Sequence, residues 1–189
     1  MKSLDIYKSF GPDNIHPKLL RSLADNPDFV CCLTNLFSKC VTECKIPKIW
    51  KTANVIALHK KDSKLDPLNY GPVSLTCILC KIYEKIIRQN ILKVVENKII
   101  KNQHGFVDSK SCFSNLLETV DSAIEMLEAG CPVDIFYFDF CKAFDSVPHY
   151  RLLIKLENCG INGPLLEIVR DFLSGRTLRT SVFRLLFIN

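Results

Sequence analysis

The chain has 189 residues, of which 48% are hydrophobic and 24% are charged, and its formal net charge is +5. This composition is typical of a globular domain with a sizeable core rather than of a disordered chain. The modest basic excess is compatible with a polyanionic partner but does not require one. The N-terminal residues M-K-S-L-D-I-Y-K lack the apolar core of a signal peptide, and we expect no membrane-spanning segment.

The first third of the chain predicts two helices and a strand. Pro17 suits the first turn of a short helix. Apolar residues at helical spacing between residues 29 and 41 predict a second, amphipathic helix. Trp50, the only tryptophan, is a candidate core anchor. Residues 54–59 then predict a strand, and residues 60–64 form a charged hairpin tip.

The middle of the chain predicts two long helices. Residues 76–98 carry a wide apolar face, with basic residues largely on the other side. That basic stripe is either a solvated face or a surface for a nucleic-acid backbone. The second helix is capped by Ser109 or Ser111 and runs to about Ala129 with its apolar residues inward. Two short helices and the start of a strand near Arg176 complete the chain.

Ten cysteines are scattered along the chain, which favours a reduced protein inside the cell, in the nucleus or the cytoplasm. Only Cys77 and Cys80 form a C-x-x-C pair, and no second pair follows, so we predict no zinc site. Because this pair lies inside an apolar helical run, we interpret both cysteines as small buried hydrophobic residues.

Residues 133–140, V-D-I-F-Y-F-D-F, predict a strand that is covered on both faces, because nearly every position is apolar, β-branched or aromatic. Asp139 lies at the carboxyl end of this run. A buried carboxylate is costly unless it is paired, hydrogen-bonded or bound to a cation, so Asp139 is a candidate Mg²⁺ ligand. The alternative is an aspartate that caps the next turn or pairs with Lys142. Asp145, before Ser-Val-Pro, fits a turn or cap residue.

The string F-Y-F-D-F-C-K-A-F-D-S-V-P-H, which ends at His149, resembles the first catalytic motif of reverse transcriptases from non-long-terminal-repeat (non-LTR), LINE-type retrotransposons. The resemblance implies that Asp139 is a catalytic residue that binds two magnesium ions, with help from the main-chain carbonyl of Phe140. It also implies that Phe144 gates the nucleotide site against a ribose 2′-hydroxyl, and that Asp145 is structural.

Two further segments resemble fingers motifs of that family. The segment K-K-D-S-K-L-D-P-L-N-Y-G-P-V-S-L implies that Lys60 or Lys61 holds the triphosphate of the incoming nucleotide, whose charges flexible ammonium groups can neutralise. The segment Q-H-G-F-V-D-S-K-S-C implies template or primer contacts by Gln103 and Lys110. The alternative for the first segment is a solvated hairpin tip.

The chain also departs from the family pattern. Gly71 and Val107 stand where the family has arginines, so two basic groups are lost. The sequence contains neither the P-Q-G-S motif nor the later pair of adjacent aspartates. Polymerases use a two-metal displacement, and Asp139 alone cannot place both ions. We therefore expect a fragment that stops after the first palm motif and is inactive by itself.

Together these features predict an α+β, helix-rich chain with a few strands, in a partial right-hand polymerase fold. Residues 1–132 would form a fingers-like region and residues 133–189 a partial palm. The implied partners are an RNA template, a DNA primer and dNTP, with Mg²⁺ as cofactor, and the oligomeric state stays open. The alternatives are a polymerase whose palm is lost from this chain only, a non-catalytic nucleic-acid-binding remnant, and an unrelated Mg²⁺-dependent phosphotransferase. Cys141 argues against the phosphotransferase, because such an enzyme would need a second aspartate at that position.

Overall fold

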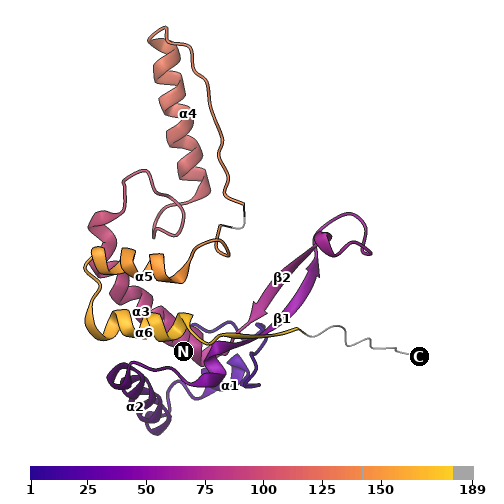
Figure 1. The fold of residues 1–189 in the computed structure, drawn as a ribbon, viewed down its shortest axis with the longest axis vertical. Coiled ribbons are helices and arrows are strands. Elements are labelled where there is room, and N and C mark those ends of the chain that lie inside the picture. Colours follow the sequence, from indigo (N-terminus) through magenta and orange to yellow (C-terminus); the bar gives the residue numbers. More distant parts are fainter. Residues whose placement is uncertain (142, 181–189) are drawn as a thin grey trace.

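The computed structural model describes residues 1–141 and 143–180 and shows a helix-rich chain with one small sheet, which confirms the α+β class (Figure 1). No helix among these residues has both the length and the apolar character needed to cross a bilayer. The helices are α1 (Pro17–Ser22), α2 (Pro27–Glu43), α3 (Ile78–Val95), α4 (Cys112–Glu128), α5 (His149–Asn158) and α6 (Gly163–Leu173). The strands are β1 (Thr52–His59), β2 (Tyr70–Leu75) and β3 (Thr177–Thr180). Short 3₁₀ turns occupy Lys48–Lys51, Pro67–Asn69 and Glu96–Lys98.

Local chemistry sets the helix boundaries. Pro17 starts α1, as predicted, since its fixed φ suits the first helical turn and its missing N–H would be unsatisfied there. Asn26 caps α2, because its side-chain oxygen accepts the N–H of Phe29 at 2.9 Å. Ser111 caps α4 through a reciprocal capping box with Ser114, which confirms the predicted cap. The N-termini of these helices are therefore set by one or two local side chains each.

The sheet has the strand order β2-β1-β3. β1 pairs antiparallel with β2, with Leu58 opposite Gly71, and parallel with β3 over residues 52–55 and 177–180. The hydroxyls of Thr52 and Thr177 lie 2.9 Å apart at the start of the parallel pair. The predicted strand start near Arg176 is thus confirmed, and the hairpin β1–β2 projects from the body of the molecule (Figure 1).

A core cluster lies where α2, α3 and α6 meet the turn before β1. Trp50 is only 3% exposed and packs against Phe37 and Tyr83, with ring centroids 6.0 and 5.7 Å away. Cys77 and Cys80 are buried in the same cluster, as predicted. Burial raises the pKa of the Cys77 thiol to about 11 and also raises the pKa of Cys80, so both stay protonated and pack as small apolar groups.

A partly buried ion pair links α6 to the N-terminal part of the chain. The carboxylate of Asp171 accepts the Ile46 N–H at 2.9 Å and the ammonium of Lys51 at 2.8 Å. Burial by itself would raise the pKa of Asp171, but these hydrogen bonds and the positive charges of Lys51 and Lys45 outweigh it and lower the pKa. The ionised form of Asp171 therefore stabilises the fold more than the protonated form does.

Replacing Asp171 by asparagine should lower the free energy of unfolding at pH 7 by about 1–3 kcal/mol, because the charge-assisted bonds are lost. Since the folded-state pKa lies below the ordinary value, the stabilisation is present above pH 4 or so and fades as the pH falls through the folded pKa. Urea unfolding at a series of pH values from 7 downward measures this, and the gap between wild type and D171N should narrow as the pH falls. Glu167→Gln is the matched control, because Glu167 forms an exposed ion pair with Arg170 on the same helix. This substitution should change the free energy of unfolding little. A constant gap across the pH series would contradict the assignment.

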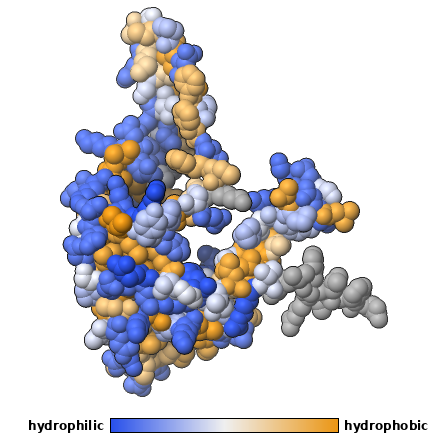
Figure 2. Space-filling model, in the orientation of Figure 1, coloured by the Kyte–Doolittle hydropathy of each residue, from blue (hydrophilic) through white to orange (hydrophobic). Residues whose placement is uncertain are grey.

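The second half of the chain contains an arm that we define as α4 together with residues 129–141. It rises away from the body, turns back at Gly130 and Cys131, and descends toward α5 (Figure 1). None of the α4 residues, all of which the structure describes, is buried, so the expectation that its apolar face points inward is wrong. Apolar side chains run over the surface of the arm (Figure 2).

The predicted strand at residues 133–140 is also wrong. These residues are extended but unpaired with any strand in the described part of the chain, and Phe138 is 93% exposed. An extended segment becomes a strand only when a neighbour satisfies its N–H and C=O groups, and β1, β2 and β3 pair with one another instead. The aromatic and β-branched composition is still that of a buried strand. Exposure of so much apolar surface to water is unfavourable in free energy.

Candidate nucleotide and nucleic-acid site

The hairpin tip that carries Lys60 and Lys61 is held by its own polar contacts. The Lys60 N–H donates to the Asn69 carbonyl at 2.8 Å, the Asn69 amide donates to the Ser63 carbonyl at 2.9 Å, and the Tyr70 hydroxyl donates to the Lys64 carbonyl at 2.9 Å. The tip therefore has a defined turn geometry, although both lysines are exposed. An exposed ammonium on an ordered turn is available to a polyanion.

Lys60 and Gly71 are neighbours across the hairpin. A Cβ built on Gly71 would lie 2.4 Å from Cε of Lys60, so the lysine side chain lies across the bare backbone of Gly71. The position at which the resemblance expects an arginine is thus covered by the side chain of Lys60. This contact distinguishes Lys60 from Lys61, which the sequence could not separate.

The loop after α3 contains Gln103 and Lys110, and both side chains turn toward the backbone. The Gln103 amide donates to the Gly105 carbonyl at 3.0 Å. The Lys110 ammonium donates to the Lys101 carbonyl. Arg88 of α3 reaches over and donates to the Phe106 carbonyl at 3.2 Å. The loop is therefore closed on itself and tied to α3, and each candidate side chain has further polar atoms beyond the one that bonds the backbone.

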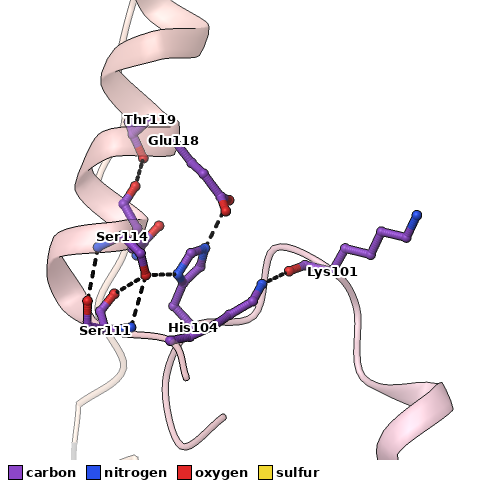
Figure 3. Close-up of polar contacts among 8 residues, drawn as sticks. Lys101, His104, Ser111, Ser114, Glu118 and Thr119 are labelled. Atoms are coloured by element: carbon purple, nitrogen blue, oxygen red, sulfur yellow. Dashed lines mark hydrogen bonds and ion pairs between the residues drawn. The ribbon is translucent and has the colours of Figure 1, made fainter. Parts of the chain in front are cut away.

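His104 fastens the same loop to α4 (Figure 3). Its Nδ1 lies 2.9 Å from the Ser114 hydroxyl and its Nε2 lies 2.9 Å from a carboxylate oxygen of Glu118. The Ser114 hydroxyl is also within 2.9 Å of both the N–H and the carbonyl of Ser111. A serine–histidine–glutamate set could indicate a nucleophile, but here the hydroxyl is occupied by the helix cap and the imidazole is buried. The cluster of His104, Ser114 and Glu118, which we call the joint, holds the loop against α4.

Asp139 and Phe140 lie in the extended part of the arm, and both are exposed. Among residues 1–141 and 143–180, no group of three or more His, Cys, Asp or Glu side chains is arranged to hold a metal ion. One carboxylate and one main-chain carbonyl do not make the ligand set that a catalytic pair of magnesium ions requires. The described residues therefore do not fit a complete two-metal centre.

Phe144 is brought into contact with the loop of Gln103 and His104. Its ring lies 6.1 Å from that of Phe106, at an interplanar angle of 85°. This edge-to-face pair joins two segments that are separated along the chain by the whole of α4. Phe144 thus contacts the loop of residues 103–110, while Asp139 lies on the arm and the two lysines lie on the separate hairpin.

Sequence reasoning missed the residues that hold these pieces together, namely Arg88, His104, Ser114 and Glu118. A partial signal was present, because Ser114 and Glu118 are four residues apart and share a face of α4. Nothing in the sequence identified a histidine in a loop as their common partner. Arg88 is one of the basic residues of α3, and its guanidinium bonds the Phe106 carbonyl and the Asp108 carboxylate of the loop.

Comparison with known proteins identifies the family. The sequence matches the family described as reverse transcriptase (RNA-dependent DNA polymerase) over residues 58–186. It is 31% identical over 182 residues to the RNA-directed DNA polymerase from mobile element jockey of Drosophila melanogaster, covering 95% of this chain and 20% of that protein. It is 27% identical over 161 residues to the Pol polyprotein from type-1 retrotransposable element R1 of Bradysia coprophila, covering 83% of this chain and 16% of that protein.

The chain belongs to the reverse transcriptases of non-LTR retrotransposons. It spans about a fifth of the length of the first curated relatives that it matches. The suspected resemblance is confirmed, and the alternative of an unrelated phosphotransferase is wrong. The family match includes the hairpin tip and β2, the loop of residues 103–110 and the motif around Asp139.

Proposed function

We propose that this chain is the fingers region and the opening part of the palm of an RNA-directed DNA polymerase. Residues 1–132 would form the fingers and residues 133–189 the beginning of the palm of a right-hand fold, of which Lys142 and residues 181–189 lie outside the described part. The observation that carries the proposal is the family match over residues 58–186, which spans every motif assigned above. The Phe106–Phe144 contact supports it, because a fingers loop meets the first palm motif there.

We further propose a division of labour among the site residues. Lys60, or Lys61, would neutralise the triphosphate of the incoming dNTP, and Phe144 would shape the nucleotide site. Gln103 and Lys110 would contact the RNA template or the DNA primer. Asp139, with the carbonyl of Phe140, would supply part of a Mg²⁺ site whose other carboxylates are not in these 189 residues. We propose that the protein acts inside the cell, in the nucleus or the cytoplasm.

The exposed arm fits this proposal. Residues 133–140 and the apolar stripe of α4 have the composition of a strand and a covering helix, yet both are exposed. In relatives about five times longer, a sheet could be completed by strands from elsewhere in the protein. We propose that this chain supplies the first strand of the palm sheet and that the sheet needs further strands to form. By itself the chain would bind substrates without catalysing their reaction.

Binding of an RNA–DNA duplex tests the nucleic-acid part of the proposal. We expect the 189-residue chain to bind a fluorescent duplex with an affinity that falls as salt rises, because phosphate contacts release counterions. Lys110→Ala should reduce both the affinity and the slope of log affinity against log salt, by an amount that corresponds to about one contact. Arg21→Ala, on α1 and far from the motifs in the sequence, is the control for general loss of charge. An affinity independent of salt would contradict the nucleic-acid role and leave the chain as a structural segment.

A further inference from the structure

The position of the arm depends on a few polar contacts at the base of α4. Helices in folded proteins are usually held by burial of an apolar face, but no residue of α4, which is described in full, is buried. The base of the helix is different, because the capping box of Ser111 and Ser114 meets the loop of residues 103–110 there (Figure 3). The side chain that joins the two segments is His104.

Both ring nitrogens of His104 are used by α4. Its side chain is only 3% exposed, and its partners Ser114 and Glu118 lie on one face of the helix. A carboxylate can only accept, so Nε2 donates to Glu118, while the contact between Nδ1 and the Ser114 hydroxyl can run in either direction. The hydroxyl has one proton, so it cannot donate to Nδ1 and to the Ser111 carbonyl at once. An imidazole with two fixed partners sets the direction of the helix as well as its distance from the loop.

The far side of the loop is anchored to the body. Arg88 of α3 donates to the Phe106 carbonyl and lies 3.5 Å from a carboxylate oxygen of Asp108. Phe106 adopts φ of 63°, a left-handed conformation that is unfavourable for a large side chain unless its surroundings hold it. Its ring then meets Phe144. The connections therefore run from α3 through the loop to α4 on one side and to the first palm motif on the other.

We propose that His104 is a positioning residue that holds the loop of Gln103 and Phe106 against α4, and so orients both the arm and the aromatic contact to Phe144. This inference rests on the proposed function, because the loop and Phe144 are the candidate contacts for nucleic acid and nucleotide. His104 would touch neither substrate. Its effect would pass through the loop conformation.

Hydrogen–deuterium exchange of the full chain tests the joint directly. In His104→Ala, amides at the base of α4, residues 114–118, and in the loop, residues 103–108, should exchange about tenfold faster, because opening of the joint costs less. Glu118→Ala should have a similar effect, whereas Glu118→Gln should keep most of the protection because its amide oxygen still accepts from Nε2–H. Glu128→Gln, at the other end of α4, is the matched control and should leave this exchange unchanged. Protection within about twofold of wild type in both alanine variants would overturn the proposal.

Affinity for the RNA–DNA duplex separates positioning from local stability. His104→Ala should bind the duplex about tenfold more weakly, and Glu118→Gln should restore the affinity relative to Glu118→Ala. Faster exchange with unchanged affinity would overturn the positioning role and leave His104 as a structural joint. A wild-type chain that binds no duplex would contradict the proposed function instead, and the exchange data would then decide alone whether His104 holds the arm.

Discussion

Asp139→Asn should abolish primer extension when the chain is placed in a complete polymerase. The host would be a chimera in which this chain replaces the matching segment of the jockey polymerase, to which it is 31% identical. We expect the chimera to extend a primed RNA template with Mg²⁺ and the variant to be slower by a factor of at least about 10²–10³, because removal of one electrostatic stabiliser of the transition state has that effect. Single-turnover incorporation of one dNTP measures the rate.

Asp145→Asn is the matched control for that experiment. Asp145 belongs to the same motif and is also an exposed carboxylate, but its assigned role is in the turn before α5. We expect it to reduce extension far less than Asp139→Asn. Equal losses in the two variants would show that the segment tolerates no change there, and an Asp139→Asn chimera with wild-type rate would remove Asp139 from the catalytic site.

Trp50→Ala should produce the largest loss of stability. The side chain is almost completely buried and contacts Phe37 and Tyr83 at the centre of the main core cluster. Truncation leaves a large cavity and removes aromatic contacts, so we expect the free energy of unfolding to fall by about 3–5 kcal/mol. That is a large share of the total stability of an ordinary domain, about 5–15 kcal/mol. Urea denaturation followed by circular dichroism measures it.

Leu65→Ala provides the comparison for an exposed apolar residue. Leu65 lies in the connection between β1 and β2 and is 94% exposed, so its truncation should change the free energy of unfolding by no more than about 0.5 kcal/mol. A Trp50→Ala variant as stable as Leu65→Ala would mean that the cluster around Trp50 is not the core of the folded chain.

The helices and the first strand could be predicted because their signals are local. Pro17 and Asn26 act within one turn of themselves, and Ser111 caps α4 through its own neighbours. The burial of Cys77 and Cys80 followed from the apolar helical pattern that surrounds them. Such features need no knowledge of what packs elsewhere in the chain.

The strand at residues 133–140 could not be predicted correctly, because pairing is a property of two segments. Its composition specifies a partner that the described residues do not provide. The inward face of α4 was mispredicted for the same reason. Both errors concern apolar surface whose covering layer would come from another segment, and both agree with a chain that spans about a fifth of its relatives.

The candidate site could be predicted in part. The motifs identified Asp139, Phe144, Gln103, Lys110 and the lysine pair, and their roles stay predictions. The contacts that organise them could not be predicted, because His104 and Glu118 meet only through folding of the loop. The contact of the Lys60 side chain with Gly71 likewise crosses the hairpin and depends on the register of its strands. The sequence motifs therefore identify the candidate site residues, and the tertiary structure identifies the residues that position them.

Primer extension by the isolated 189-residue chain is the most direct test of the central proposal, that the chain carries a polymerase site of which only one catalytic carboxylate is present. With Mg²⁺, dNTP and a primed RNA template, we expect binding of the template and no incorporated nucleotide above the level of the Asp139→Asn chain. Incorporation by the wild-type chain that is lost in Asp139→Asn would contradict the proposal, because the chain would then complete its metal site without further carboxylates.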